Sequence, residues 1–375
     1  MKKLFLPFFA VLLIFIFPQI IKAQFFSDAA IPDTNIIKIQ NQKFGIQFNS
    51  LAFFKNNEYF HPLIEGYTLP GFQLQPRLYY SIGENFDLEA GAHFSQFSGK
   101  KGLNSFDPLF RATYSPSESF SILLGWLKGT TSHQLIEPLF QWEKVYTDPL
   151  EYGVQFLVNK PNFRFDTWID WEKYIELNDP FQEELTFGTS NKILIFGKNG
   201  FEFWIPVQAT IKHMGGQVTT VGDPLKTLVN WTTGLNLIYN QRESLIKRIN
   251  FDFYYVGFND FSPQKIQAFK NGYGLYPVLS ANISAFQASL GYWYGHHFIS
   301  SKGEPLFQSV SATNPLAIYP NREVVTFKTS FYKQIFKNVS FAAYFESYLD
   351  TKIKQMDYSY GISMSVSGDI LLKQK

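Results

Sequence analysis

After residue 23, apolar and polar residues alternate along one segment after another, and no apolar run reaches the length of a membrane-spanning helix. In the clearest segment, Phe163, Phe165, Thr167, Ile169 and Trp171 alternate with Arg164, Asp166, Trp168, Asp170 and Glu172. Successive side chains of a β-strand point to opposite faces, so each segment would have one apolar and one hydrated face. Segments of about ten residues also have the length at which a tilted strand crosses a membrane. The pattern predicts an all-β fold.

The first 23 residues have the composition of a signal peptide. Lys2 and Lys3 precede an apolar stretch, and Ala23 provides a small residue before cleavage at Gln24. An uncleaved anchor is the alternative, because the stretch approaches the lower length limit of a spanning helix. We expect export of the chain.

Composition argues against several classes of protein. The chain contains no cysteine, so disulfides, cysteine-linked lipids and thiolate metal sites are absent. Its formal charge is +2, but the signal peptide holds three lysines, and the remainder has 30 basic and 31 acidic residues. No basic stripe remains, so we expect no nucleic-acid partner. Gly215-Gly216 and Asn271-Gly272 precede no predicted helix, so we expect no phosphate cradle and no cofactor.

Short and long connections alternate along the chain. Short polar breaks, typical of tight hairpin turns, lie at 83–85, 116–118, 160–162, 198–200 and 337–338. Long loops separate them, at roughly 55–71, 98–106, 129–149, 174–182, 213–226, 259–274 and 299–322. This alternation is typical of transmembrane barrels, in which short periplasmic turns alternate with long extracellular loops. We expect no such alternation in a soluble sandwich. We predict a transmembrane antiparallel β-barrel of about sixteen strands. A strand number from fourteen to eighteen is compatible with the sequence, because the turn near Asn282 can be placed in more than one way.

The leader, the alternation and the loop asymmetry resemble those of outer-membrane β-barrels with porin-like architecture, over residues 44–368. The resemblance implies that the first strand pairs with the last, because an open edge would leave backbone groups unpaired in lipid. Many members of this class end in an aromatic residue, whereas this chain ends with Leu371 to Lys375. We therefore expect the last strand to stop near Val366, unless insertion uses another signal.

The expected organisation is a signal peptide over 1–23, a periplasmic N-terminal segment over 24–43 and an outer-membrane β-barrel over 44–375. The resemblance implies a location in the cell outer membrane. It also implies outer-membrane lipids and small hydrophilic solutes as partners, and it is compatible with a homo-oligomer.

The charged residues of the hydrated faces suggest a function. On these faces, eight carboxylates stand against four basic residues. Charged rings select ions by sign, so we predict a passive porin or solute-specific channel with a mild preference for cations and neutral solutes. We expect no enzyme. The predicted pore-lining residues are Arg77, Asp87, Glu89, Arg164, Asp166 and Asp170.

Three further functions belong to different classes of protein, and the first is a barrel-embedded lipid hydrolase. His93-Phe94-Ser95 has the His-x-Ser spacing of outer-membrane phospholipases, and Asn104 would orient the pair for attack on a lipid ester. By the alternation, however, His93 and Ser95 face the lumen, whereas a lipid ester would lie outside the barrel. The second is a non-conducting outer-membrane scaffold or assembly protein, and the third is a secreted soluble β-protein that acts on glycans.

Aromatic and histidine residues complete the prediction. We expect Trp126, Trp171 and Trp231 in the aromatic belts at the membrane surfaces. His133 is interpreted as an isolated loop histidine, and His296-His297 as neighbours on opposite faces of a strand. We therefore predict no metal site.

Overall fold

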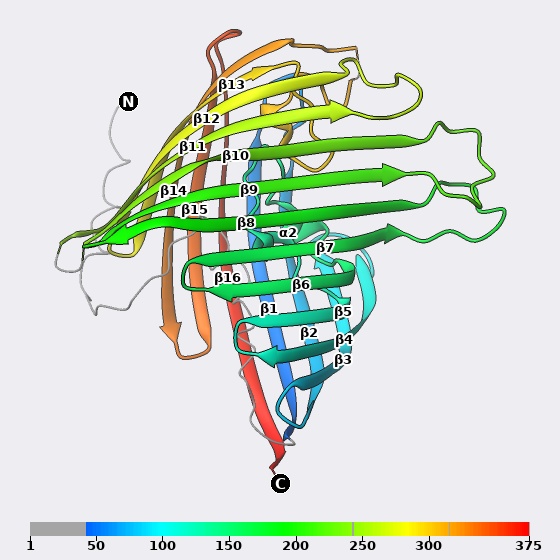
Figure 1. Cartoon of the computed structure of the whole chain (residues 1–375), viewed down its shortest axis with the longest axis vertical. Helices are drawn as coiled ribbons and strands as arrows, with labels where there is room; N and C mark the ends of the chain where they lie inside the picture. The colour runs from blue at the N-terminus through cyan, green and yellow to red at the C-terminus, as the bar shows by residue number, and fades with distance from the viewer. Residues whose placement is uncertain (1–42, 242–243, 315, 375) are drawn as a thin grey trace, which may run out of the picture.

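In the computed structural model of the chain, residues 43–374 are described, except for 242–243 and 315 (Figure 1). Within this range, sixteen antiparallel strands form one closed barrel. Each strand pairs with its neighbours in the sequence, and the first strand pairs with the last. The predicted signal peptide and all but the last residue of the predicted periplasmic segment lie outside the described residues.

The strands of the first half are β1 (Lys43–Glu58), β2 (Thr68–Ile82), β3 (Phe86–Phe97), β4 (Ser105–Ser117), β5 (Phe120–Trp126), β6 (Tyr152–Lys160), β7 (Phe163–Lys173) and β8 (Glu184–Lys198). Those of the second half are β9 (Phe201–Met214), β10 (Lys226–Asn240), β11 (Ile246–Asp260), β12 (Asn271–Ile283), β13 (Phe286–His296), β14 (Asn321–Phe336), β15 (Val339–Asp350) and β16 (Gln355–Gln374). Three short helices are η1 (Thr130–His133), α2 (Lys144–Thr147) and η2 (Pro305–Phe307). None of these described helices is long and apolar enough to cross a membrane.

The barrel and its sixteen strands confirm the prediction, and the uncertain turn lies between Ile283 and Phe286. The predicted end of the last strand was wrong. β16 continues to Gln374, which pairs with Lys43 at the start of β1. The physical reason is closure, because every residue of β1 that lacked a partner on β16 would expose backbone donors and acceptors at a sheet edge.

The two faces of the wall have the predicted characters. On β2, Phe72 and Leu78 point outward and are 46% and 47% exposed, whereas Arg77 points inward and is 2% exposed. Trp126 is an exception to the predicted belts. It lies inside the barrel at the end of β5, with the guanidinium carbons of Arg77 and Arg111 4.9 and 3.8 Å from its ring centroid. Two inward cations therefore hold this ring away from lipid.

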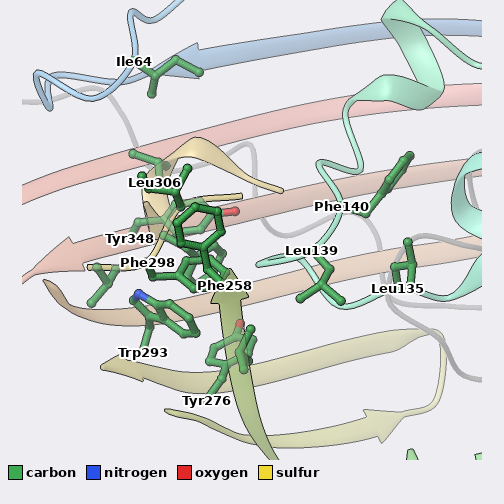
Figure 2. Close-up of a cluster of buried hydrophobic side chains, with 14 of the residues drawn as sticks. Ile64, Leu135, Leu139, Phe140, Phe258, Tyr276, Trp293, Phe298, Leu306 and Tyr348 are labelled. Carbon is green, nitrogen blue, oxygen red and sulfur yellow. The ribbon is translucent and has the colours of Figure 1, made fainter. Parts of the chain in front are cut away.

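Two of the long loops fold back into the lumen, where their apolar side chains form a buried cluster with residues of the wall (Figure 2). We call residues 127–151 and 297–311 the plug. Phe298 and Phe307 of the plug pack edge-on against Trp293 of the wall, with ring centroids 5.0 and 5.4 Å apart. Leu135 and Leu139 belong to the same buried cluster. The interior thus holds an apolar core, in addition to the hydrated side chains that were predicted.

The wall is low where β5 and β6 lie, since these strands have 7 and 9 residues and β8 has 15. The β4–β5 register pairs Arg111 with Gly125 and puts Phe110 opposite Trp126, the last residue of β5, so residues 105–109 extend beyond the end of β5. Pro108 has no N–H to leave unpaired there, and the Tyr152 hydroxyl donates to its carbonyl over 3.2 Å. We call this gap between β4 and β7 the notch. It lies at the end of the barrel that carries the long loops, hereafter the loop end.

Candidate functional site

A group of polar side chains points outward at the loop end of β1, β2 and β16. Asn56 lies opposite Thr68 on β2 and opposite Tyr360 on β16. Thr68 Oγ1 donates to Asn56 Oδ1 over 2.5 Å, and Asn56 Nδ2 donates to Glu58 Oε1 over 2.7 Å and to the Tyr360 hydroxyl over 3.2 Å. We call these four residues the outer polar row.

The surroundings place the row at the boundary of the apolar wall. One step closer to the barrel centre, Phe54 and Ile362 are 38% and 50% exposed and continue the apolar outer face. One step toward the loops, Phe60 packs against Tyr358 with ring centroids 6.4 Å apart. Aromatic rings of this kind mark the interface in barrels, which is also the level of the ester groups of lipids. The row therefore lies where an outer-leaflet ester could reach it.

The inward residues of the same segment attach it to the plug. Lys55 Nζ lies 2.9 Å from Glu143 Oε2, and Asn57 Nδ2 donates to the same oxygen over 2.7 Å. The Tyr67 hydroxyl donates to Glu143 Oε1. Burial and the adjacent Glu143 hold the pKa of Tyr67 far above its usual value, so this hydroxyl keeps its proton. Glu143 thus fixes the ends of β1 and β2, two of the three strands that present the row.

The bonding pattern assigns chemical capacities within the row. Thr68 donates its proton to an amide oxygen, which is not a base, so Thr68 is not activated as a nucleophile. The Tyr360 hydroxyl accepts from Asn56, so its own proton can be donated to a ligand. Glu58 is the one carboxylate of the row and can accept a proton from water. The row can therefore support attack by water.

The structure places the predicted hydrolase motif on the inner face. His93 Nδ1 pairs with Gln75 Nε2 at 3.0 Å, and the Ser95 and Ser105 hydroxyls lie 2.8 Å apart. Asn104 Nδ2 donates to Ser95 Oγ over 3.4 Å. Among the described residues no hydrogen bond joins His93 to Ser95, so the motif has no base paired with a nucleophile.

All six predicted pore-lining residues face the interior, where each has a protein partner. Arg77 and Glu89 form an ion pair of 3.2 Å, Asp87 accepts from Ser81, Arg164 donates to the Ser132 carbonyl over 2.7 Å, Asp166 bonds His133 at 2.9 Å, and Asp170 lies 3.5 Å from Lys302. Three of these partners, Ser132, His133 and Lys302, belong to the plug. Lining of an open pore stays a prediction for these residues.

His133, interpreted from the sequence as isolated, is held between two carboxylates. Its Nδ1 lies 2.9 Å from Asp166 and its Nε2 lies 2.8 Å from Glu151, while its ring stacks on Trp168 at 3.4 Å. Burial opposes a charged ring, but the two carboxylates outweigh burial and raise the pKa of His133 to about 9. With both nitrogens occupied, His133 anchors the plug to the wall and cannot act as a base.

The backbone bends at the His296-His297 pair. His297 has a φ of 54°, and the two rings stack with centroids 3.8 Å apart instead of lying on opposite faces. His296 Nδ1 lies 2.7 Å from Asn321 Oδ1. The prediction of opposite faces was wrong because the strand ends at His296.

A closed barrel with an apolar outer wall and aromatic rings at its loop end is an outer-membrane β-barrel. Similar solved structures include a loop-deletion mutant of OmpT, an outer membrane protein of Vibrio cholerae, with 9% identity, a TM-score of 0.54 and coverage of 87% of this chain and 100% of that one. Another is the outer membrane protein OprD from Pseudomonas aeruginosa, with 8% identity, a TM-score of 0.52 and coverage of 91% and 97%. At these identities the likeness concerns the fold alone.

The sequence profile of the lipid A 3′-O-deacylase-type family matches residues 36–375, so the chain belongs to that family. No curated protein matches the chain.

Family membership corrects one expectation. We expected no enzyme, and that expectation was wrong, because the family is an enzyme family named for removal of an acyl group from lipid A. The hydrolase motif that the sequence suggested faces inward. Three of the four residues of the outer polar row lay in what was predicted as the loop 55–71, because β1 was expected to end at residue 54, four residues before its end at Glu58. The signal that could have found it is a run of polar residues, Asn56 to Glu58, directly after an apolar strand.

Proposed function

We propose that this protein hydrolyses an acyl ester of a lipid A-type glycolipid in the outer leaflet, at the outer polar row. Membership of the deacylase-type family carries the proposal. The position of the row supports it, because Asn56, Glu58, Thr68 and Tyr360 form a polar group on a face that otherwise meets acyl chains. A lipid ester would reach this face by lateral diffusion, without entering the barrel.

In the proposed reaction, Glu58 accepts a proton from a water molecule as the water oxygen attacks the ester carbonyl. The Tyr360 hydroxyl donates a hydrogen bond to the oxygen that becomes negative in the tetrahedral intermediate. Collapse of the intermediate breaks the bond to the sugar oxygen, which leaves with the proton from Glu58. The products are a fatty acid and a sugar hydroxyl, and no other reactant is consumed.

The filled lumen favours this reaction over passive conduction. A pore needs a continuous water path, whereas Leu139, Phe298 and Phe307 pack with Trp293 across the interior. The fold-level likeness to other outer-membrane barrels says nothing of conduction in this chain.

The test uses the refolded full chain in bilayers that contain hexa-acylated lipid A, with mass spectrometry of the released fatty acid. We expect Glu58→Gln to lower the rate by about 100-fold or more, the usual contribution of a general base. Glu84→Gln, which removes the same charge at the short turn on the opposite end of the barrel, should leave the rate unchanged. Absence of fatty acid from the wild-type reaction, or equal rates for both variants, would contradict the proposal.

A further inference from the structure

A cavity of about 380 Å³ lies at the notch. His93 and Asp107 line it from the inner face of β3 and β4, whereas Tyr152 and Trp171 line it with side chains of the outer face. A cavity lined from both faces must cross the wall, and it does so where β5 and β6 end early. Its volume lies in the range of about 300 to 1,000 Å³ that is usual for small-molecule sites.

Two polar groups in this cavity lack hydrogen-bond partners in the part of the chain that the structure describes. His93 is 1% exposed, and its Nδ1 can only accept from the Gln75 amide nitrogen, so its proton lies on Nε2. That Nε2 has no hydrogen-bond partner among the described residues. Asp107 lies directly opposite His93 in the β3–β4 register, and no hydrogen bond or ion pair joins its carboxylate to another described residue. Both residues line the cavity, so its lining holds an unused donor, buried at His93 Nε2, beside an unused acceptor.

We propose that the notch cavity binds a sugar residue. A sugar hydroxyl can accept from His93 Nε2 and donate to Asp107 through a single oxygen. An ammonium group would leave His93 unsatisfied, since it has no acceptor. A phosphate would be repelled by Asp107, and Lys302, which also lines the cavity, is already paired with Glu172 at 2.7 Å. The rings of Tyr152 and Trp171 offer apolar faces for the C–H side of a pyranose.

The sugar can come from two sources, free in solution or joined to a lipid. Because the cavity crosses the wall, an alkyl chain attached to a bound sugar could leave along the outer face. Methyl glucoside and octyl glucoside carry the same sugar and differ in this chain, so their dissociation constants separate the two sources. This proposal is independent of ester hydrolysis, because binding is measured without turnover.

The experiment measures binding of both glucosides to the full chain in phosphatidylcholine nanodiscs by saturation-transfer NMR. We expect saturable binding that Asp107→Asn and His93→Ala each weaken at least 10-fold, as expected for loss of a charge-assisted or buried hydrogen bond. Asp223→Asn, an exposed change in the loop between β9 and β10, is the matched control and should bind like the wild type.

Each outcome decides the question. Binding of octyl glucoside at least 10-fold tighter than that of methyl glucoside assigns a glycolipid, whereas equal binding assigns a free sugar. No saturable binding of either glucoside to the wild type overturns the proposal. So does unchanged binding in Asp107→Asn and His93→Ala, provided that both variants keep the heat-modifiable mobility of a folded barrel.

Discussion

At the scale of single residues, Glu143 connects the plug to the candidate site. It is 4% exposed and takes three donors, Lys55, Asn57 and Tyr67, from the ends of β1 and β2. Alternation along β1 means that the residues between these donors, Asn56 and Glu58, point outward into the outer polar row. One buried carboxylate therefore sets the backbone from which the row projects.

Glu143→Gln should destabilise the barrel because it leaves Lys55 buried, with Glu346 at 3.7 Å as its remaining carboxylate partner. Removing one member of a buried ion pair costs about 3 to 5 kcal/mol. We expect the free energy of unfolding, measured by urea titration of the refolded chain in detergent micelles, to fall by about 3 kcal/mol. The control is Asp148→Asn, which removes the exposed partner of Lys144 in the same loop and should cost less than about 1 kcal/mol. Equal effects of the two substitutions would contradict this role of Glu143.

At the scale of elements, the strands could be predicted from the sequence and the plug could not. Period-two alternation follows directly from strand geometry, so segments such as 163–171 identify themselves. The plug segments have no such period, and for that reason they were predicted as parts of the surface loops 129–149 and 299–322. Their signal was composition, since Leu135, Leu139, Leu306 and Phe307 are too apolar for exposed loops. Periodicity finds which side of a wall a residue faces, but it does not say that a loop returns into the lumen.

The site was missed for a related reason. The row forms where strands end, and the end of a strand is the least certain feature of a periodic pattern. Its members also come from three strands, β1, β2 and β16, whose closeness depends on closure of the barrel. The notch cavity likewise combines residues of β3, β4 and β7, and no spacing in the sequence places Asp107 near Trp171.

We call His133 together with Asp166 and Glu151 the charged clamp, and it predicts a pH dependence of plug anchoring. The pKa of His133 is raised to about 9, so its contribution is complete below the unfolded value of about 6.5 and is lost as pH rises through 9. Burial opposes ionisation of Glu151, but His133 outweighs it and lowers the pKa of Glu151 to about 2. That contribution is complete above the unfolded value of 4.5 and is lost as pH falls toward 2.

Anchoring of the plug should therefore be strongest between about pH 4.5 and 6.5 and should weaken toward pH 9 and above. Amide hydrogen exchange of residues 127–151, corrected for the intrinsic rate at each pH, measures this directly. His133→Gln keeps hydrogen-bonding capacity without the charge, so its protection should change little between about pH 6.5 and 9.5. A wild-type profile as flat as that of His133→Gln would contradict the charged clamp.

At the scale of the whole molecule, the barrel wall and its contents have separate tasks. The outer face meets lipid and carries the outer polar row, and the notch gives the lipid side access to a cavity near β3 and β4. The lumen is occupied by the plug, which packs on wall residues such as Tyr276 and Trp293 and forms ion pairs with the wall. In this arrangement the proposed chemistry lies at the rim and the outer wall, and the interior serves as the core that a soluble domain would have.

A filled lumen predicts low conductance. The wild-type chain in planar bilayers should give no porin-sized steps, because the apolar cluster around Leu139 and Phe307 blocks the water path. Substituting both residues by Asp puts unpaired charges into that cluster, which is costly, and should drive the plug out of the lumen. Conductance should then appear, and the inward charges would line the opened path.

In this background Asp166→Asn with Asp170→Asn should lower cation selectivity, seen as a smaller reversal potential in a salt gradient. The control places Asp at Leu177 and Phe261, which are 68% and 66% exposed in loops, and should stay closed. Steps of porin size in the wild type, or in this control, would mean that the plug does not close the barrel.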